Sequence, residues 1–113
     1  KTVGIGAFEN CTELKDISLP TTLTEINYYT FSGCTSLTTL TLHSKLTAIN
    51  NYAFAGCKSL TEIHCKNSNP PLIGENTFRD VNRIGCKIFV PSKRAKKSYS
   101  TALYWNEFTI YIE

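Results

Sequence analysis

An apolar pattern recurs every 23 residues between residues 8 and 65. Its clearest copy reads FAGCKSLTEIHC and begins at residue 54. Every apolar position of this copy still holds an apolar residue when 23 or 46 is subtracted from its number. The three copies are Phe8, Cys11, Leu14, Ile17 and Leu19; Phe31, Cys34, Leu37, Leu40 and Leu42; and Phe54, Cys57, Leu60, Ile63 and Cys65. A constant period of this length is typical of a solenoid, in which stacked repeats bury a shared core.

Each copy contains a segment that we expect to form a β-strand. These segments span residues 14–19, 37–42 and 60–65, and each ends in an apolar, polar, apolar alternation. Alternation with period two indicates a half-buried strand. Residues 20–26 and 44–49 then carry matching Leu and Ile positions flanked by Thr, which favours a short second strand or an extended turn. We therefore expect one main strand per repeat, stacked in parallel into a continuous sheet.

The third part of each unit predicts a tight turn. In residues 27–34 and 50–57, the Phe, the Cys and the Leu that follows are spaced three residues apart. This spacing favours a short 3₁₀ or α turn. Gly33 and Gly56 are expected at backbone angles that a side chain disfavours. Asn10 holds this place in the first unit, and Asn is among the residues that best tolerate left-handed angles.

The register changes after residue 65. Residues 66–71 read as a polar loop with two prolines, and residues 73–78 resume the repeat one residue late. Val81 and Ile84 take the places of the Cys and Leu columns. Residues 86–91 alternate and end in proline, so they predict a fourth strand.

The last segment predicts a helix followed by a strand. Ser92 is suited to cap the helix N-terminus. The helix then shows one apolar stripe, made of Ala95, Tyr99, Ala102 and Leu103. The final strand shows alternating apolar residues, namely Phe108, Ile110 and Ile112. Such a segment closes the apolar end of a repeat stack, as solenoids require.

These patterns predict one domain over residues 1–113, with repeats in 1–91 and a cap in 92–113. Val3 matches Ile26 and Ile49 at the same period, so the chain begins inside a repeat. No cap pattern precedes the first repeat. We therefore expect further repeats upstream of residue 1, together with any signal and anchor, because the opening residues lack the apolar region of a signal peptide.

Composition and charge exclude several classes of protein. The net charge of +3 is too small to indicate a nucleic-acid partner. No apolar run approaches the roughly 20 residues that span a bilayer, so we expect no membrane insertion. Phosphate-binding glycine loops are absent, and we expect no cofactor.

The five cysteines are an odd number, so at least one is unpaired within the chain. Cys11, Cys34 and Cys57 share a column that a solenoid places inside, and we expect a reduced, buried stack, with disulfides or metal as the alternatives. No C-x-x-C spacing is present, which disfavours structural zinc. Cys65 and Cys86 fall near neighbouring strands, and a disulfide between them is left open.

The phrases AFENCTELKDISLP, TFSGCTSLTTLTL and AFAGCKSLTEIHC resemble the BspA-like leucine-rich repeats, in which an aromatic residue, Gly-Cys, an LxxIxL strand and a short Ile-Gly return follow one another. The segment FVPSKRAKKSYSTALYW looks like the C-terminal cap of that family. The resemblance covers nearly the whole chain, although the fourth unit lacks Gly-Cys. It implies a mostly β α/β solenoid, a right-handed leucine-rich repeat superhelix with short 3₁₀ or α turns and a helix–strand cap.

The resemblance also implies a function and a location. Known members are mainly secreted or surface-attached proteins of host-associated bacteria and some protozoan parasites. Some of them bind host matrix or plasma proteins, and the family supplies no catalytic residues. We therefore expect an extracellular or cell-surface adhesion module with a protein ligand, and a structural spacer or capping domain without a ligand is the alternative.

The expected binding surface is the concave face of the sheet, where the polar residues of successive strands form rows. The first row is Asp16, Thr39, Glu62 and Lys87; the second is Ser18, Thr41, His64 and Phe89; the third is Pro20, His43, Lys66 and Pro91. The candidate binding residues are Thr39, Thr41, His43, Glu62, His64, Lys66, Lys87 and Phe89. A solvated face rich in Thr, a residue common in strands, is the competing interpretation.

Three other features have a functional and a plain interpretation. His43 and His64 are close enough in the rows to be considered for a shared metal, but two ligands are a weak signal. The basic run over residues 93–97 either contacts an anionic surface or is the solvated side of a helix. His64 and Cys65 are adjacent, but neighbouring strand residues point to opposite faces, so they cannot form a catalytic pair. We expect no enzymatic activity.

Overall fold

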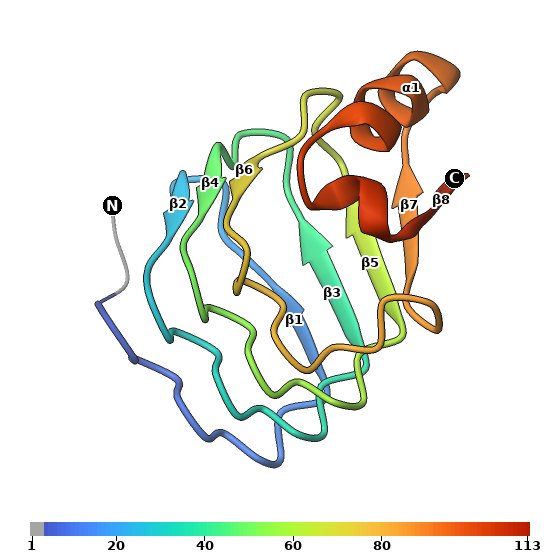
Figure 1. Ribbon diagram of the computed structural model, residues 1–113. Helices are drawn as coiled ribbons and strands as arrows, with labels where there is room; N and C mark the ends of the chain where they lie inside the picture. The colour runs from blue at the N-terminus through green and yellow to red at the C-terminus, as the bar shows by residue number, and fades with distance from the viewer. Residues whose placement is uncertain (1–3) are drawn as a thin grey trace.

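The computed structural model describes residues 4–113, so Val3 lies outside the described residues (Figure 1). Its main sheet has five parallel strands in the order β1-β3-β5-β7-β8. The strands are β1 (Asp16–Ser18), β3 (Thr39–Leu42), β5 (Glu62–Cys65), β7 (Lys87–Val90) and β8 (Thr109–Ile112). The predicted strand of each repeat and the predicted fourth and final strands are thus confirmed.

The return segments form a second, smaller parallel sheet in the order β2-β4-β6. Its strands are β2 (Glu25–Ile26), β4 (Ala48–Ile49) and β6 (Leu72–Ile73). Each coil of the chain passes from the main sheet to this smaller sheet and comes back through a turn segment (Figure 1). Threonine hydroxyls reinforce the stack, because Thr38, Thr47 and Thr61 each donate to a carbonyl 23 residues earlier.

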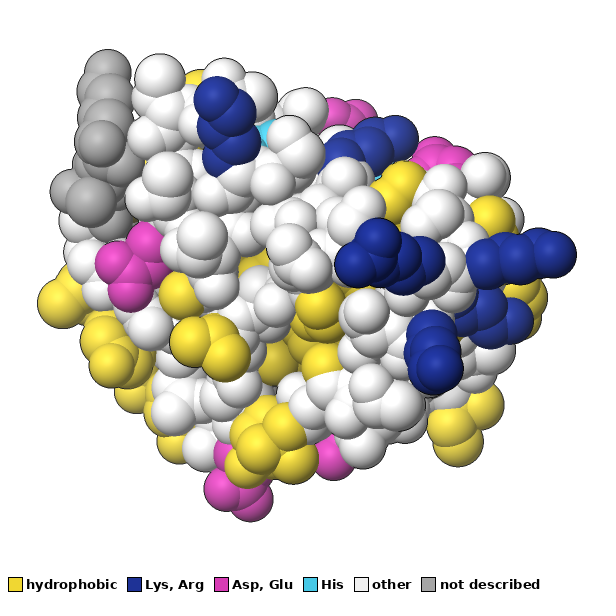
Figure 2. Space-filling view, turned by 90° about the horizontal axis from the view of Figure 1, so that it is seen from above, with side chains coloured by type: hydrophobic (Ala, Val, Ile, Leu, Met, Phe, Trp, Pro, Cys, Tyr) yellow, Lys and Arg dark blue, Asp and Glu magenta, His cyan; other side chains and the backbone are white. Residues whose placement is uncertain are grey.

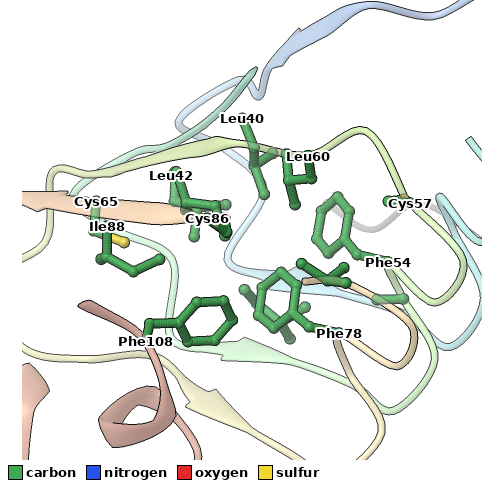
Figure 3. Close-up of a cluster of buried hydrophobic side chains, with 14 of the residues drawn as sticks. Leu40, Leu42, Phe54, Cys57, Leu60, Cys65, Phe78, Cys86, Ile88 and Phe108 are labelled. Atoms are coloured by element: carbon green, nitrogen blue, oxygen red, sulfur yellow. The ribbon is translucent and has the colours of Figure 1, made fainter. Parts of the chain in front are cut away.

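The phenylalanine column forms the centre of the core. Phe8, Phe31, Phe54 and Phe78 stack in sequence, with ring centroids 5.4, 5.3 and 5.5 Å apart and rings within 10° of parallel. Phe54 is fully buried, and the aliphatic columns and Cys57 surround it (Figure 3). The stacked surroundings expected from the 23-residue period are confirmed. Phe8 is 44% exposed because the repeat that contains it is the first of the stack that the structure describes.

The cysteine column is reduced, as expected; Cys34 and Cys57 are buried, and Cys11 is half-buried. The Cys34 thiol donates to the Phe8 carbonyl at 3.5 Å, and the Cys57 thiol donates to the Phe31 carbonyl at 3.3 Å. A cysteine in this column therefore packs as a small apolar residue and also satisfies a carbonyl of the preceding repeat. All five cysteines are free.

The strand register separates Cys65 from Cys86. His64 lies opposite Phe89 and Glu62 lies opposite Lys87, so Cys65 and Cys86 are offset by about four residues along neighbouring strands. This offset corresponds to roughly 13 Å, which is beyond the reach of a disulfide. Both thiols are buried in the core and free.

The turn segments form the expected turns, with 3₁₀-type hydrogen bonds from an amide to the carbonyl three residues earlier, but these turns do not extend into a regular helix. Half of their amide groups bond within the segment, as Cys34 N–H does to Phe31 O at 3.3 Å. The others bond to the next repeat, as Phe31 N–H does to Ala53 O and Gly33 N–H does to Ala55 O, both at 2.8 Å. A helix needs all of these groups for itself, so the hydrogen bonds between repeats prevent it.

Left-handed angles occur where they were expected and also at other positions, among them two stacked tyrosines. Gly33 and Gly56 have φ of 77°, and Asn10 has φ of 62°. Tyr29 and Tyr52 also have φ of 61° and 64°, which is uncommon for large side chains. Their rings stack at 5.0 Å, and this contact offsets part of the cost.

The C-terminal segment folds as helix α1 (Lys93–Thr101), a 3₁₀ helix η1 (Trp105–Glu107) and strand β8. The Ser92 side chain accepts from Ala95 N–H, which confirms the N-cap. Three predicted core positions are wrong: Leu103, Ile84 and Ile112 are 69%, 90% and 44% exposed. Helix α1 ends before Leu103, and the Asn82 side chain bonds the amide of Ile84 in a turn.

The cap is fixed to the loop of residues 66–71. The Tyr99 hydroxyl donates to Asn67 O at 2.7 Å, and the Trp105 indole N–H donates to Pro71 O at 2.8 Å. Burial raises the pKa of Tyr99 above its usual range, so this hydroxyl keeps its proton and remains a donor. The loop that interrupts the 23-residue register is therefore the segment to which the cap is hydrogen-bonded.

We expect the native protein at pH 8 to react with Ellman's reagent at no more than one thiol, that of half-buried Cys11. Burial raises the pKa of Cys57 and of Cys86 to about 12, and it also raises that of Cys34 and of Cys65. The thiolate is the reactive form, so these four thiols stay inert. All five should react in 8 M urea, and two or more fast thiols in the native protein would contradict the buried column.

Candidate functional site

The outer face of the main sheet carries the predicted rows in register. Asp16, Thr39, Glu62 and Lys87 lie opposite one another along neighbouring strands, and so do Ser18, Thr41, His64 and Phe89. Strand β8 extends both rows, the first with Thr109 and the second with Tyr111. All of these side chains are at least partly exposed. The strand alternation that buries Leu40 and Ile63 is what places them on the outside.

Three rings form a continuous strip across the C-terminal half of this face. The rings of His64 and Phe89 lie 4.8 Å apart and 12° from parallel, and those of Phe89 and Tyr111 lie 5.7 Å apart at 29°. We call His64, Phe89 and Tyr111 the aromatic strip. Each residue comes from a different strand, so the backbone ladder fixes the spacing of the rings. Aromatic side chains held in this way offer contact area at low entropic cost.

Charged side chains surround the aromatic strip. His64 Nε2 lies 3.0 Å from Glu62 Oε1, and His64 Nδ1 lies 3.0 Å from Glu113 Oε2. Each ring nitrogen of His64 is therefore within hydrogen-bond distance of a carboxylate oxygen. Lys66 Nζ is 3.5 Å from the second oxygen of Glu113. Lys87 Nζ lies 5.8 Å from the centroid of the Tyr111 ring.

The N-terminal half of the face has a different character. Its rows are occupied by the hydroxyls of Ser18, Thr39 and Thr41 and by the carboxylate of Asp16. The face is therefore divided into a hydroxyl half on β1 and β3 and an aromatic, charged half on β5, β7 and β8. Aromatic side chains carry more of the energy of protein interfaces than Ser or Thr, so the second half is the stronger candidate.

His43 does not lie on this exposed face, unlike the other predicted binding residues. It is 8% exposed, and its Nδ1 accepts from Lys45 N–H at 3.1 Å. Its Nε2 is buried without a partner among residues 4–113. His64 has both nitrogens engaged by carboxylates, and the described part of the chain holds no group of three or more potential metal ligands. The geometry gives no support to a metal shared by the two histidines.

The sequence rows missed two residues of the site, Tyr111 and Glu113. The alternation of Phe108, Ile110 and Ile112 already placed Tyr111 on the opposite face of the last strand. Parallel pairing of β8 with β7 brings it beside Phe89. The contact of Glu113 with His64 spans 49 residues and depends on that pairing, so no local sequence signal indicates it.

The geometry does not assemble a catalytic pair from His64 and Cys65. Cys65 is fully buried in the core, whereas His64 lies on the outer face of the sheet, as strand alternation predicts. Burial raises the pKa of Cys65, so its thiol is not activated as a nucleophile.

In residues 4–113, helix α1 and η1 are both too short and too polar to cross a bilayer.

Comparison with known proteins agrees with the repeat architecture. The family model described as BspA type leucine rich repeat region (6 copies) matches residues 1–106. No curated protein matches the chain. The match covers most of the chain, including the four-phenylalanine column, strands β1, β3, β5 and β7 and the cap helix. Repeats of this class form stacked, protein-binding folds. The chain therefore belongs to the BspA type leucine-rich repeat family.

Proposed function

We propose that this chain is an interaction or adhesion module of a secreted or surface-attached protein, and that it binds an extracellular-matrix or plasma protein. The observation that supports this proposal is the aromatic strip on a rigid sheet face, with Glu62, Lys66, Lys87 and Glu113 around it. A central aromatic group with a charged rim is the usual composition of an energetic centre in protein interfaces.

The rigidity of the face supports binding rather than simple solvation. Phe89 and Tyr111 are held by strand pairing on one or both sides, and His64 is fixed further by two carboxylates. These side chains of the sheet face therefore lose little entropy when a partner binds. The mixed signs of the charges favour a partner with its own ordered charges over a uniform polyanion.

We expect the double variant Phe89→Ala and Tyr111→Ala to weaken binding to its protein ligand by roughly 30-fold or more, as for the loss of aromatic hot spots. Charge reversal at Glu62 and Lys66 should also weaken it. The ligand is sought by surface plasmon resonance against a panel of immobilised extracellular-matrix and plasma proteins. The change affects only exposed or half-exposed side chains, so circular dichroism should show an unchanged fold.

The matched controls lie away from the main sheet. Tyr28→Ala removes an aromatic ring that is 45% exposed in a turn segment, and charge reversal at Lys58 and Glu75 alters exposed charges there. These variants should bind like the unmodified chain. If the sheet-face variants also bind unchanged, the sheet face is not the binding surface, and a spacer role for the stack becomes the better interpretation.

A further inference from the structure

The first turns of helix α1 carry a cluster of exposed basic side chains. Lys93, Arg94, Lys96 and Lys97 are all exposed, whereas Ala95 and Tyr99 are the buried residues of the helix. With 3.6 residues per turn, the four cations lie on the side opposite this buried pair. Figure 2 shows the dark-blue side chains gathered over the C-terminal side of the molecule. We call these four residues the basic face.

Nothing in residues 4–113 neutralises the basic face. None of the four cations forms an ion pair there, and the first turn of α1 has no acidic residue. The two carboxylates of the cap are engaged elsewhere, Glu107 with Arg83 at 2.8 Å and Glu113 with His64 and Lys66. Neighbouring cations three and four residues apart repel each other, and cations oppose the dipole at a helix N-terminus. The arrangement is unfavourable for the fold, and an anionic partner would relieve it.

We propose that the basic face binds a linear anionic polysaccharide, through its sulfate or carboxylate groups. The four cations begin within about 6 Å of one another along the helix axis, so they form a compact strip that matches the close charges of a single chain. This strip has no aromatic ring on which nucleic-acid bases could stack. The apolar residues of the helix are buried, so the strip has no apolar group to enter a lipid bilayer.

This second site is independent of the proposed protein-binding face. The basic face belongs to α1, and the aromatic strip belongs to β5, β7 and β8. A glycan site on the cap and a protein site on the sheet are thus tested by different variants. Loss of one should leave the other unchanged.

The experiment uses heparin as the probe. Replacing all four cations by Gln is expected to weaken heparin binding roughly tenfold or more at 0.1 M salt and to flatten its salt dependence, because fewer counterions are released. The control replaces four exposed cations elsewhere, Lys15, Lys45, Lys58 and Arg79, by Gln. It produces the same change in net charge and should retain heparin binding. Gln is a good helix former, and loss of the repulsion should leave the melting temperature equal or higher.

Two further arms separate polysaccharide binding from other polyanion binding. Phosphatidylglycerol vesicles and duplex DNA are compared with heparin at the same salt concentration, and both should bind more weakly. The proposal is overturned if heparin binding is unaffected by the Gln variant, if the control variant weakens it equally, or if vesicles or DNA bind as tightly as heparin through the same four residues.

Discussion

Replacing Phe54 by alanine is expected to lower the free energy of unfolding by about 3–5 kcal/mol, as for other large buried aromatics. Phe54 is fully buried and is stacked on both faces, on Phe31 at 5.3 Å and on Phe78 at 5.5 Å. The hydrogen bonds between repeats hold those neighbours in place, so the cavity cannot collapse easily. Equilibrium denaturation in urea, followed by far-UV circular dichroism, measures the change.

Phe8→Ala is the matched control from the same column. Phe8 is 44% exposed and, within residues 4–113, stacks on one face only, against Phe31. Phe8→Ala should therefore lower the free energy of unfolding by well under half as much as Phe54→Ala. A loss below about 1 kcal/mol for Phe54→Ala, or equal losses for the two variants, would contradict a core built from the phenylalanine column.

The repeat core could be predicted from the sequence because every copy repeats the same environment. A buried position in one unit identifies its equivalents, as with Phe31 and Phe54, and the strand alternation then separates the inner residues from the outer ones. The row pairs that join Thr39 to Glu62 and Thr41 to His64 follow directly from the 23-residue period. That same regularity placed most of the candidate binding residues on one face.

The period carries no information about features that break the repeat. His43 is buried although its row position predicts exposure. The turns that the spacing predicts do form, but about half of their amides bond to the next repeat, so no regular helix develops from them. Leu103 continues the helical stripe in sequence, yet the helix has already ended. In each case the outcome depends on hydrogen bonds or packing that the 23-residue period does not encode.

The aromatic strip also combines residues that the 23-residue period predicts with residues that it does not predict. His64 and Phe89 could be paired from the rows, although the register changes by two residues between their repeats. Tyr111 and Glu113 enter the site only because the last strand pairs with β7 in parallel. The repeats thus contribute some residues of the candidate site, and the cap contributes the others. Changes that loosen the cap should therefore also disturb the site.

Trp105→Ala is expected to produce the second large loss of stability, about 3–5 kcal/mol. Trp105 is 1% exposed and lies between the repeats and the cap. Its ring centroid is 5.2 Å from that of Tyr99 and 5.8 Å from that of Phe78. Its N–H also donates to the carbonyl of Pro71 at 2.8 Å, in a buried site. Trp105→Phe keeps most of the packing and should cost about 1–3 kcal/mol, the usual cost of a buried carbonyl left without its donor.

Leu103→Ala is the control, because Leu103 belongs to the same segment but is 69% exposed, and its loss should stay within about 0.5 kcal/mol. The measurement is chemical denaturation followed by circular dichroism. Tryptophan fluorescence cannot be used, because Trp105 is the only tryptophan of the chain and the variants remove it. Hydrogen exchange should show that Trp105→Ala releases the amides of α1 and β8 before those of β3 and β5. If all strands lose protection together, the cap is an inseparable part of the stack. If Trp105→Ala costs less than about 1 kcal/mol, the indole does not anchor the cap to the loop of residues 66–71.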